Sequence, residues 1–282
     1  MDFKLKIFQR FNKTLFNLTG LRVYPVKSRF HELHDDDIFL VSYPRSGNTW
    51  LRFIIANLIT DFDTPLTFDT YKKYVPSLED FKVNRKISKI PSPRILKSHD
   101  VFDPRYKKVV YLVRDPRSVA VSFYFLLKRD RKINESVSFD NFFLEFIEGK
   151  FSKGLFSNYG SWGEHVGSWV GAIGDKEKKF LMIKYEDLKS NTFSKVGEII
   201  NFLGLSFSDE KIKKAIEFSS FEMMKKFSDQ KIELHKKLKV DTSIPFVRKA
   251  SDDEWKDYFN SKSLELLYRK FEKQINICEY KF

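Results

Sequence analysis

A loop that combines arginine, glycine and hydroxyl side chains stands out near the start of the chain. It reads YPRSGNTW over residues 43–50 and lies between the apolar run 38–42 and a stretch with apolar residues at helical spacing. A strand that turns directly into a helix leaves the first helical N–H groups unpaired and facing any bound anion. Gly47 lets the backbone approach closely, while Arg45 and Thr49 add a charge and a hydroxyl. The loop predicts a phosphate-binding site, and an ordinary helix-capping turn is the alternative.

The spacing of this loop differs from that of the common ATP- and GTP-binding loop. The GxxxxGK[ST] motif places a lysine directly after its second glycine, and no Gly-Lys pair occurs near Gly47. Magnesium-dependent hydrolysis of ATP or GTP is therefore not the natural interpretation. A P-loop nucleotide kinase stays open as the alternative from another enzyme class.

A second basic segment reads VYLVRDPRSVAVS over residues 110–122. Here again an apolar strand ends in a charged turn that opens a helix. Arg114 lies at the carboxyl end of the strand, where ligands bind in open α/β sheets, and Ser122 follows one or two helical turns later. The segment predicts a site for a second phosphate, unless Arg114 simply pairs with Asp115 or another carboxylate.

A third basic segment reads PFVRKA over residues 245–250 and is followed by Trp255 and Lys256. The adjacent Arg248 and Lys249 could close over a phosphate from the other side. Solvated surface charge is the ordinary alternative for such a pair.

One histidine is placed to act as a base. Of the five histidines, only His99 follows the end of a predicted strand beside a lysine, in the sequence Lys97-Ser98-His99. A neutral imidazole can take a proton from a hydroxyl near physiological pH. Taken alone, a single histidine is more often structural. The other four are His31, His34, His165 and His235.

The elements that must position these residues alternate along the chain. Short apolar runs predict strands at 38–42, 95–96, 107–113 and 180–183. Alternating strands and helices predict one α/β domain with a central parallel sheet flanked by helices. The predicted helices cover about 51–59, 117–128, 139–150, 161–173, 193–203, 209–217 and 262–275.

The composition fits such a domain and narrows its partners. Of the 282 residues, 42% are apolar and 32% charged, which is ordinary for a globular protein, and the net charge of +13 predicts anionic partners. No arginine-rich block or aromatic-basic motif predicts nucleic-acid binding. The single cysteine, Cys278, excludes a disulfide within the chain and a cysteine metal site. Without a signal peptide or an apolar run of about eighteen residues, a cytoplasmic location is predicted.

Residues 1–18 have the pattern of a basic amphipathic helix. Packing of its apolar stripe on the domain and peripheral contact with an anionic membrane both stay open. The stripe consists of Phe3, Ile7, Phe11, Leu15 and Leu18.

Together, the three basic segments resemble the cytosolic-type sulfotransferase family. Residues 43–50 resemble its 5′-phosphosulfate loop, residues 111–122 its 3′-phosphate strand and helix, and residues 248–256 its C-terminal phosphate clamp. The resemblance extends from about residue 38 to 259. Further matches occur in order at Lys97-Ser98-His99, Gly160-Ser161-Trp162 with His165, Tyr185-Glu186-Asp187 and Ser219-Ser220-Phe221.

The resemblance implies an enzyme with a P-loop-like nucleotide-binding architecture in residues 36–282, after a lead-in formed by residues 1–35. Its reaction would be direct, in-line transfer of the sulfuryl group of 3′-phosphoadenosine 5′-phosphosulfate (PAPS) to an acceptor hydroxyl or amine. The product would be 3′,5′-ADP (PAP), and no metal would take part. The acceptor would be a small molecule, a lipid or a glycan. A catalytically inactive relative that only binds ligands is a further alternative.

The resemblance also implies a role for each site residue. His99 would be the base, with Lys97 and Arg45 stabilising negative charge. Residues 45–50 would hold the 5′-phosphosulfate. Arg114, Ser122, Arg248 and Lys249 would hold the 3′-phosphate, and Trp50, Tyr185, Ser219 and Phe221 would surround the adenine. The full cofactor-binding set would be Arg45, Ser46, Gly47, Asn48, Thr49, Trp50, Arg114, Ser122, Tyr185, Ser219, Phe221, Met224, Arg248, Lys249 and Ala250.

Three departures from the family pattern bear on this site. Arg45 stands where family members often carry lysine, and Ala250 stands where glycine is usual. Residues 252–254 add three acidic side chains to the clamp. The family's C-terminal dimerisation signature is not recognisable in residues 260–282, so the sequence predicts no oligomeric state.

Overall fold

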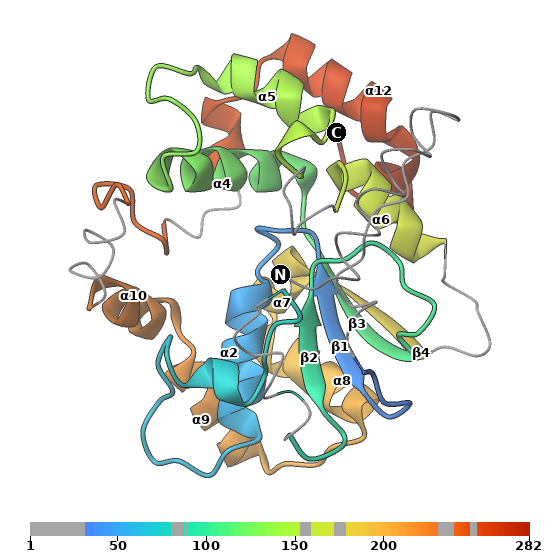
Figure 1. Cartoon of the computed structure of the whole chain (residues 1–282), viewed down its shortest axis with the longest axis vertical. Coiled ribbons are helices and arrows are strands. Elements are labelled where there is room, and N and C mark those ends of the chain that lie inside the picture. Colours follow the sequence, from blue (N-terminus) through green and yellow to red (C-terminus); the bar gives the residue numbers. More distant parts are fainter. Residues whose placement is uncertain are drawn as a thin grey trace, which may run out of the picture.

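Four short parallel strands form the centre of the protein, in the order β2-β1-β3-β4 (Figure 1). They are β1 (Ile38–Ser42), β2 (Ile95–Ser98), β3 (Lys108–Val113) and β4 (Lys179–Lys184). The sheet confirms the predicted strands and their parallel arrangement. The computed structural model describes residues 32–79, 87, 90–152, 159–171, 179–230, 240–248 and 253–282. Residues 1–18, Lys249 and Ala250 lie outside this range, so what the sequence predicts for them stays a prediction.

The strand register brings the carboxyl ends of the strands together. Val41 of β1 lies opposite Ser98 of β2 and Tyr111 of β3. Because β1 pairs with β2 on one side and β3 on the other, the chain reverses its direction of progress across the sheet beside β1. Such a switch point is where open α/β sheets bind ligands.

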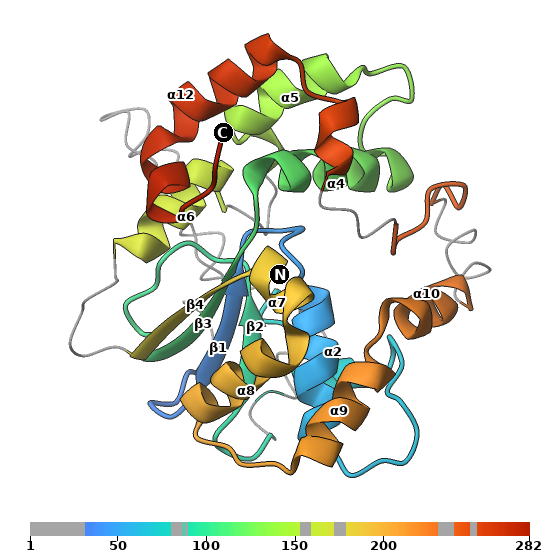
Figure 2. The same cartoon turned by 180° about the vertical axis from the view of Figure 1, so that it is seen from behind.

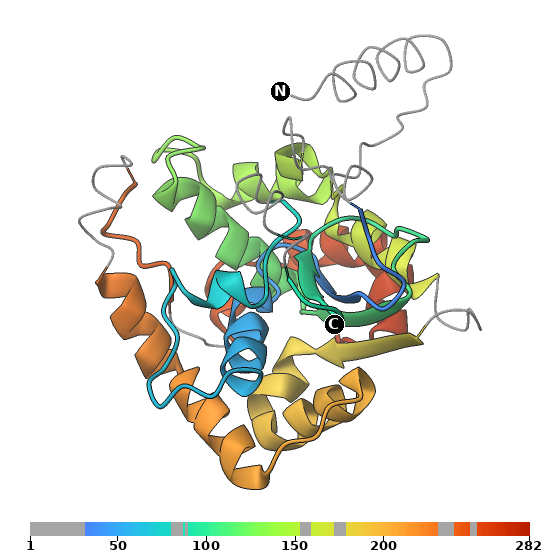
Figure 3. The same ribbon diagram turned by 60° about the horizontal axis from the view of Figure 1, so that its bottom comes forward.

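Alternating side chains of the strands feed two separate cores, since successive residues of a strand point to opposite faces. On one face, Ile38 and Leu40 pack with the apolar sides of α2 (Asn48–Leu58), α8 (Thr192–Leu203) and α9 (Asp209–Phe218). Figure 3 shows α2, in blue, beside the orange α9.

On the other face, Phe39 and Val41 pack with α6 (Trp162–Val170), α5 (Phe139–Ile147) and α12 (Ser261–Ile277). This core is aromatic, with fully buried rings at Trp162 and Trp169. Figure 2 shows α12 beside α5 and α6, with α8 on the opposite side of the sheet. The sheet therefore lies between two layers of helices, and its carboxyl edge is open between them.

The other helical elements in the described residues are η2 (Tyr71–Lys73), α4 (Pro116–Arg129), η3 (Lys150–Ser152), α7 (Tyr185–Ser190), α10 (Phe221–Asp229) and η4 (Glu254–Asp257). Of these, α4, α7, α10 and η4 border that edge. Neither α7 nor α10 was predicted, and α7, with six residues, spans too few turns to show a clear helical period. The expected helix 139–150 is shorter, since α5 ends at Ile147. No helix in the part of the chain described has both the length and the apolar character needed to cross a bilayer.

Candidate active site

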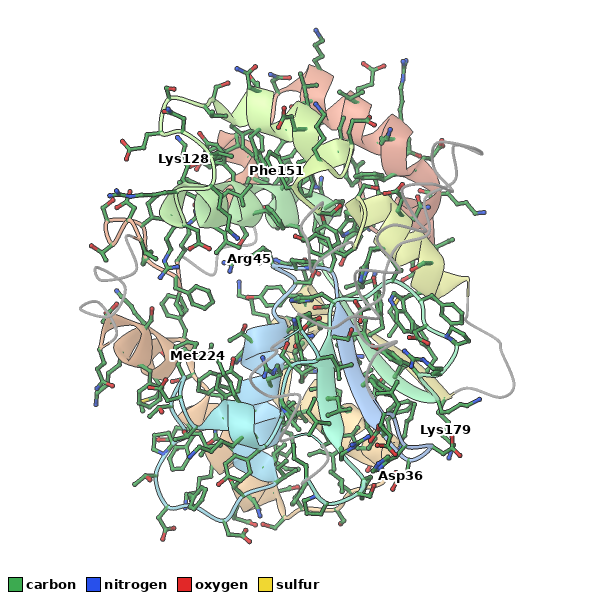
Figure 4. The ribbon with its side chains drawn as sticks, viewed as in Figure 1. Asp36, Arg45, Lys128, Phe151, Lys179 and Met224 are labelled. Atoms are coloured by element: carbon green, nitrogen blue, oxygen red, sulfur yellow. The ribbon has the colours of Figure 1, made fainter. Side chains whose placement is uncertain are left out.

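The carboxyl ends of the strands open into a cavity of about 750 Å³. Its wall combines the loop after β1, the residues after β2 and β3, the start of α7, part of α10 and the segments around Phe246 and Trp255. Figure 4 shows Arg45 beneath α4 and Met224 on α10. The predicted site residues that line the cavity are Arg45, Gly47, Asn48, Thr49, Trp50, Lys97, His99, Arg114, Ser122, Tyr185, Phe221, Met224 and Arg248.

The loop between β1 and α2 leaves the start of the helix open. Gly47 precedes α2 with φ of 91°, and no side chain caps the first turn. The first N–H groups of α2 are therefore available to an anion. A Cβ atom on Gly47 would lie 2.4 Å from Cδ2 of Tyr185, so this position needs glycine for its conformation and for the close approach of the ring. Asn48 fixes the loop, since its Nδ2 donates to the carbonyl oxygen of Leu40 at 3.1 Å.

Buried polar atoms without partners gather at the same place. Among the residues that the structure describes, these atoms are Ser46 Oγ, Asn48 Oδ1 and Arg114 Nε. Buried polar groups are almost always hydrogen-bonded, so an exception marks a place where a ligand or water belongs. Ser46 Oγ and Arg114 Nε are donors that suit an anion. Ser46 itself is 1% exposed and does not line the cavity wall.

Arg45 connects the two predicted anion sites. Its Nε donates to Ser122 Oγ at 3.0 Å, and its carbonyl oxygen accepts from Arg114 Nη1 at 3.2 Å. Burial, with smaller contributions from Arg114 and Arg248, lowers the pKa of the Arg45 guanidinium to about 10. The group stays charged at neutral pH, but it lies among other cations that repel it. A bound polyanion would offset this repulsion.

Arg114 does not pair with its neighbour Asp115. The Asp115 carboxylate instead caps α4 by accepting from the Arg117 backbone N–H at 2.8 Å, and it binds the Arg117 guanidinium. The guanidinium of Arg114 lies 4.3 Å from the centre of the Tyr185 ring. Pairing with Asp115, the alternative left open by the sequence, is therefore wrong.

The clamp arginine is held by one of the acidic residues that depart from the family pattern. Arg248 forms a short ion pair with Glu254, and both side chains are 13% exposed. The Arg248 guanidinium also lies 3.6 Å above the Phe125 ring. Burial lowers the pKa of Arg248. Arg248 thus stands at the cavity already fixed in place, with a carboxylate on one edge.

The end of β2 orients a histidine. His99 Nδ1 lies 2.6 Å from the carbonyl oxygen of Ser42. A carbonyl can only accept, so Nδ1 carries the proton in the neutral ring and Nε2 keeps a lone pair. Burial, reinforced by Lys97, lowers the pKa of His99 to about 3. Behind it, buried His165 is hydrogen-bonded through Nε2 to the His99 carbonyl at 3.2 Å.

A carboxylate that the sequence did not predict joins Lys97 to His99. Residues 76–79 pair with the edge of β2, through Lys97 N–H to the Pro76 carbonyl at 2.8 Å and Leu78 N–H to the Lys97 carbonyl at 2.9 Å. This places Glu79 Oε2 2.8 Å from Lys97 Nζ, while Oε1 accepts from the His99 backbone N–H. Although burial opposes it, the charges of Lys97 and His99 hold the pKa of Glu79 well below its usual range. No periodicity in residues 61–93 could have revealed this contact.

Another part of the cavity wall is aromatic. The rings of Trp50 and Tyr185 lie 5.9 Å apart at 71°, with Phe221 and Met224 nearby on the wall. Ser219 is fully buried behind these rings, and its hydroxyl donates to the Ala215 carbonyl at 2.8 Å. Its own carbonyl accepts from Trp50 Nε1 at 3.0 Å. The structure thus places Ser219 as a support for Trp50, whereas the sequence predicted that Ser219 contacts the adenine directly.

These features define a class of protein. A parallel sheet with an open helix start, a group of arginines and two neighbouring aromatic rings at its switch point is suited to a nucleotide that carries several anionic groups. The oriented histidine adds the capacity for proton transfer.

Comparison with known proteins identifies the family. The family model described as "Sulfotransferase domain" matches residues 35–278. The chain is 32% identical over 265 residues to sulfotransferase 1E1 of Bos taurus, covering 89% of this chain and 87% of the relative. The human sulfotransferase 1E1 is 30% identical over 261 residues, with coverages of 88% and 86%. The chain belongs to the sulfotransferase domain family, which makes it an enzyme of the transferase class.

Solved structures agree with this fold. Mouse sulfotransferase SULT7A1, crystallised with PAP, matches with a TM-score of 0.67 and 27% identity, over 88% of this chain and 87% of that one. A retinol dehydratase complex with androsterone and PAP matches with a TM-score of 0.71 over 100% and 96% of the two chains. At 19% identity, the second likeness shows the fold alone.

Proposed function

We propose that this enzyme transfers the sulfuryl group of PAPS to the hydroxyl or amine of a small-molecule acceptor and releases PAP. The observation that carries the proposal is the pair of anion-binding groups on the two sides of loop 43–47. The open start of α2 lies on one side and Arg114, with its unpaired Nε, on the other. The SULT7A1 relative binds PAP, a nucleotide with a 5′ and a 3′ phosphate. Two separate anion sites fit that nucleotide better than ATP, whose phosphates form one row.

The residues of the cavity fit the parts of the nucleotide. The first-turn N–H groups of α2 and the Thr49 side chain would hold the 5′ group, with the buried Ser46 hydroxyl behind the cavity wall as a further donor. Arg114, Ser122 and Arg248 would hold the 3′-phosphate. Trp50, Tyr185, Phe221 and Met224 would enclose the adenine. Lys249 and Ala250 complete the proposed set from outside the described residues.

PAPS supplies a sulfuryl group activated by its bond to phosphate, and the chain supplies proton transfer and charge stabilisation. His99 Nε2 accepts the acceptor's proton, since Nδ1 is committed to the Ser42 carbonyl. The resulting imidazolium is stabilised by the same hydrogen bond. Lys97 and Arg45 line the cavity as cations that stabilise negative charge on the transferred and leaving groups. Glu79 keeps the Lys97 ammonium in place.

The proposal includes the boundaries and surroundings that the sequence predicts. Residues 36–282 form the catalytic domain after a lead-in of residues 1–35, and the enzyme works in the cytoplasm without a metal. Membrane-borne lipids and glycans are the finer acceptor classes, and an anionic membrane is the proposed partner of residues 1–18 if these do not pack on the domain. The family assignment lends no support to a nucleotide kinase or to an inactive binding protein.

Binding measurements and an acceptor screen test the activity together. By calorimetry we expect PAP to bind more tightly than 5′-AMP and than ATP with magnesium. With labelled PAPS, we expect transfer to at least one hydroxyl or amine compound in a panel of phenols, steroids, lipids and sugars, also in the presence of a chelator. Equal affinity for PAP and 5′-AMP would overturn the nucleotide assignment. Transfer that stops in chelator and returns with magnesium would overturn the metal-free reaction.

Replacing the base separates catalysis from binding. In His99→Ala we expect turnover to fall roughly 10²- to 10⁴-fold, the usual contribution of a general base, while PAP affinity stays within about twofold of the unmodified protein. The matched control is His34→Ala, since His34 is exposed and precedes β1 at the amino end of the sheet. A His99→Ala protein with normal turnover would remove His99 from the mechanism.

A further inference from the structure

Arg117, in the first turn of α4, lies between two aromatic rings that come from distant parts of the chain. Its guanidinium carbon is 4.0 Å from the centre of the Trp255 ring and 4.1 Å from that of the Phe282 ring. The side chain is 11% exposed. A planar, weakly hydrated guanidinium is the cation best suited to such stacking.

The edges of the same guanidinium are occupied as well. Nε and Nη2 donate to the Asp115 carboxylate at distances of 2.5 to 3.0 Å. Nη2 also donates to the Lys281 carbonyl at 3.0 Å. One side chain therefore joins the β3–α4 junction, η4 and the chain segment 279–282.

Two of the joined segments, the β3–α4 junction and η4, adjoin a group proposed to hold the 3′-phosphate. Asp115 directly follows Arg114. Trp255 lines the cavity and follows Glu254, the ion-pair partner of Arg248. Among the described residues, those that line the cavity do not include Arg117. Arg117 can therefore influence nucleotide binding only through the segments that it contacts.

The segment 279–282 is tied to the neighbouring strand end in addition. The Tyr280 hydroxyl donates to Glu186 Oε2 at 3.1 Å, and Glu186 Oε1 accepts from the Asp115 backbone N–H at 3.1 Å. Glu186 directly follows Tyr185, whose ring lies beside Arg114. The segment thus fixes the ends of both β3 and β4 that face the nucleotide.

We propose that Arg117 is a positioning residue for nucleotide binding, and that it holds η4 and segment 279–282 against the β3–α4 junction so that Arg114 and Arg248 reach the same phosphate. The inference rests on the proposed function, because it assigns Arg117 to the 3′-phosphate site of that nucleotide. Lysine cannot replace it, since an ammonium neither stacks between two rings nor bonds a carboxylate and a carbonyl along one planar edge.

The test compares PAP with 5′-AMP, which lacks the 3′-phosphate, in Arg117→Lys and Phe282→Ala. In Arg117→Lys we expect PAP affinity to fall roughly threefold to tenfold, the range of a lost buried cation–π contact, with 5′-AMP affinity changed less than about twofold. Phe282→Ala removes one stacking ring from a partly exposed position, so it stays informative if Arg117→Lys fails to fold. We expect it to lower the ratio of the two affinities about twofold.

Arg105→Lys is the matched control, because Arg105 binds Asp103 in the same Asp-x-Arg arrangement away from the cavity. We expect it to leave both affinities unchanged. A purely structural role for Arg117 would lower the melting temperature and leave the affinity ratio intact, and that result would overturn the inference. If the unmodified protein itself fails to prefer PAP over 5′-AMP, the proposed function is wrong. If it prefers PAP and both variants keep its ratio, only the positioning role is wrong.

Discussion

The protein turns from strand to helix beside the cavity in two contrasting ways. At the β1–α2 junction, Gly47 adopts a left-handed conformation and no side chain caps the helix. At the β3–α4 junction, Asp115 caps the helix with its carboxylate, and Pro116 removes one of the unpaired N–H groups. The first junction leaves its backbone N–H groups available to a ligand. At the second junction, the Asp115 cap accepts one such group and Pro116 removes another.

The difference shows two ways of binding an anion at the same edge of a sheet. The β1–α2 junction offers backbone N–H groups, so its function depends on conformation and on the absence of a Cβ atom. The β3–α4 junction offers side chains, Arg114 before the helix and Ser122 within it. Its function depends on charge, and its backbone serves mainly to place those side chains. Substitutions should therefore affect the two junctions differently.

Adding one methyl group at the first junction should produce the largest effect. In Gly47→Ala, the left-handed φ costs about 1–3 kcal/mol of stability, and the new Cβ atom displaces the Tyr185 ring. We expect PAP affinity to fall more than about a hundredfold, since two or more charge-assisted hydrogen bonds are lost. Calorimetry and thermal unfolding measure the two effects.

Gly197→Ala is the matched control for this experiment. Gly197 lies inside α8, and a Cβ atom there would meet nothing within 4 Å. In a helix interior, alanine is more favourable than glycine by about 1 kcal/mol. We therefore expect Gly197→Ala to have equal or higher stability and unchanged PAP affinity. If Gly47→Ala bound PAP normally, the backbone of the first junction would not be the anion site.

Removing charge at the second junction should have a smaller and more selective effect. Arg114→Ala loses a charge-assisted hydrogen bond worth about 1.5–3 kcal/mol, so PAP affinity should fall roughly 10- to 150-fold. The affinity for 5′-AMP should change little, and the protein should then distinguish poorly between the two nucleotides. Arg269→Ala, an exposed arginine on α12, provides the control. An equal loss for both ligands would place Arg114 at the 5′ group instead.

Removing the hydrogen bond between the two junctions should lower PAP affinity by a still smaller factor. Ser122→Ala removes the hydrogen bond that Arg45 Nε makes to Ser122 Oγ. A hydrogen bond to a charged group at a partly exposed site contributes about 1–2 kcal/mol, and the bound phosphate retains its other contacts. We expect PAP affinity to fall about threefold to tenfold with turnover less affected. A larger loss than in Arg114→Ala would mean that Ser122 is the principal 3′-phosphate ligand.

At the end of β2, the titration of His99 can be compared between the folded and the unfolded protein. Burial and Lys97 lower the pKa of His99 from 6.5 to about 3, so the proton-accepting neutral form persists until the pH falls toward that value. In the nucleotide-free protein we expect the His99 ring signals in NMR, assigned by their loss in His99→Ala, to stay constant from about pH 8 to pH 5. In urea they should titrate near the ordinary value of about 6.5. A midpoint near 6.5 in the folded protein would show that Lys97 and burial do not control this group.

Much of this architecture follows from the sequence alone. Apolar runs such as residues 38–42 report burial locally, and strands that alternate with helices pack as a parallel sheet. Since the carboxyl ends of parallel strands meet at one edge, Arg45, His99 and Arg114 could be expected near one another although about seventy residues separate the first from the last. Motifs at strand ends are therefore readable without a structure.

Only the tertiary structure decided which partners these residues have. Glu79 reaches Lys97 and His99 because residues 76–79 pair with the edge of β2, and Glu254 reaches Arg248 because η4 packs beside α4. Arg117 meets Phe282 from the far end of the chain. Periodicity and spacing describe how a segment sits relative to its own neighbours, whereas such contacts depend on how distant segments pack. For that reason the sequence could predict the groups that face the nucleotide, while the groups that hold them in place became visible only in the fold.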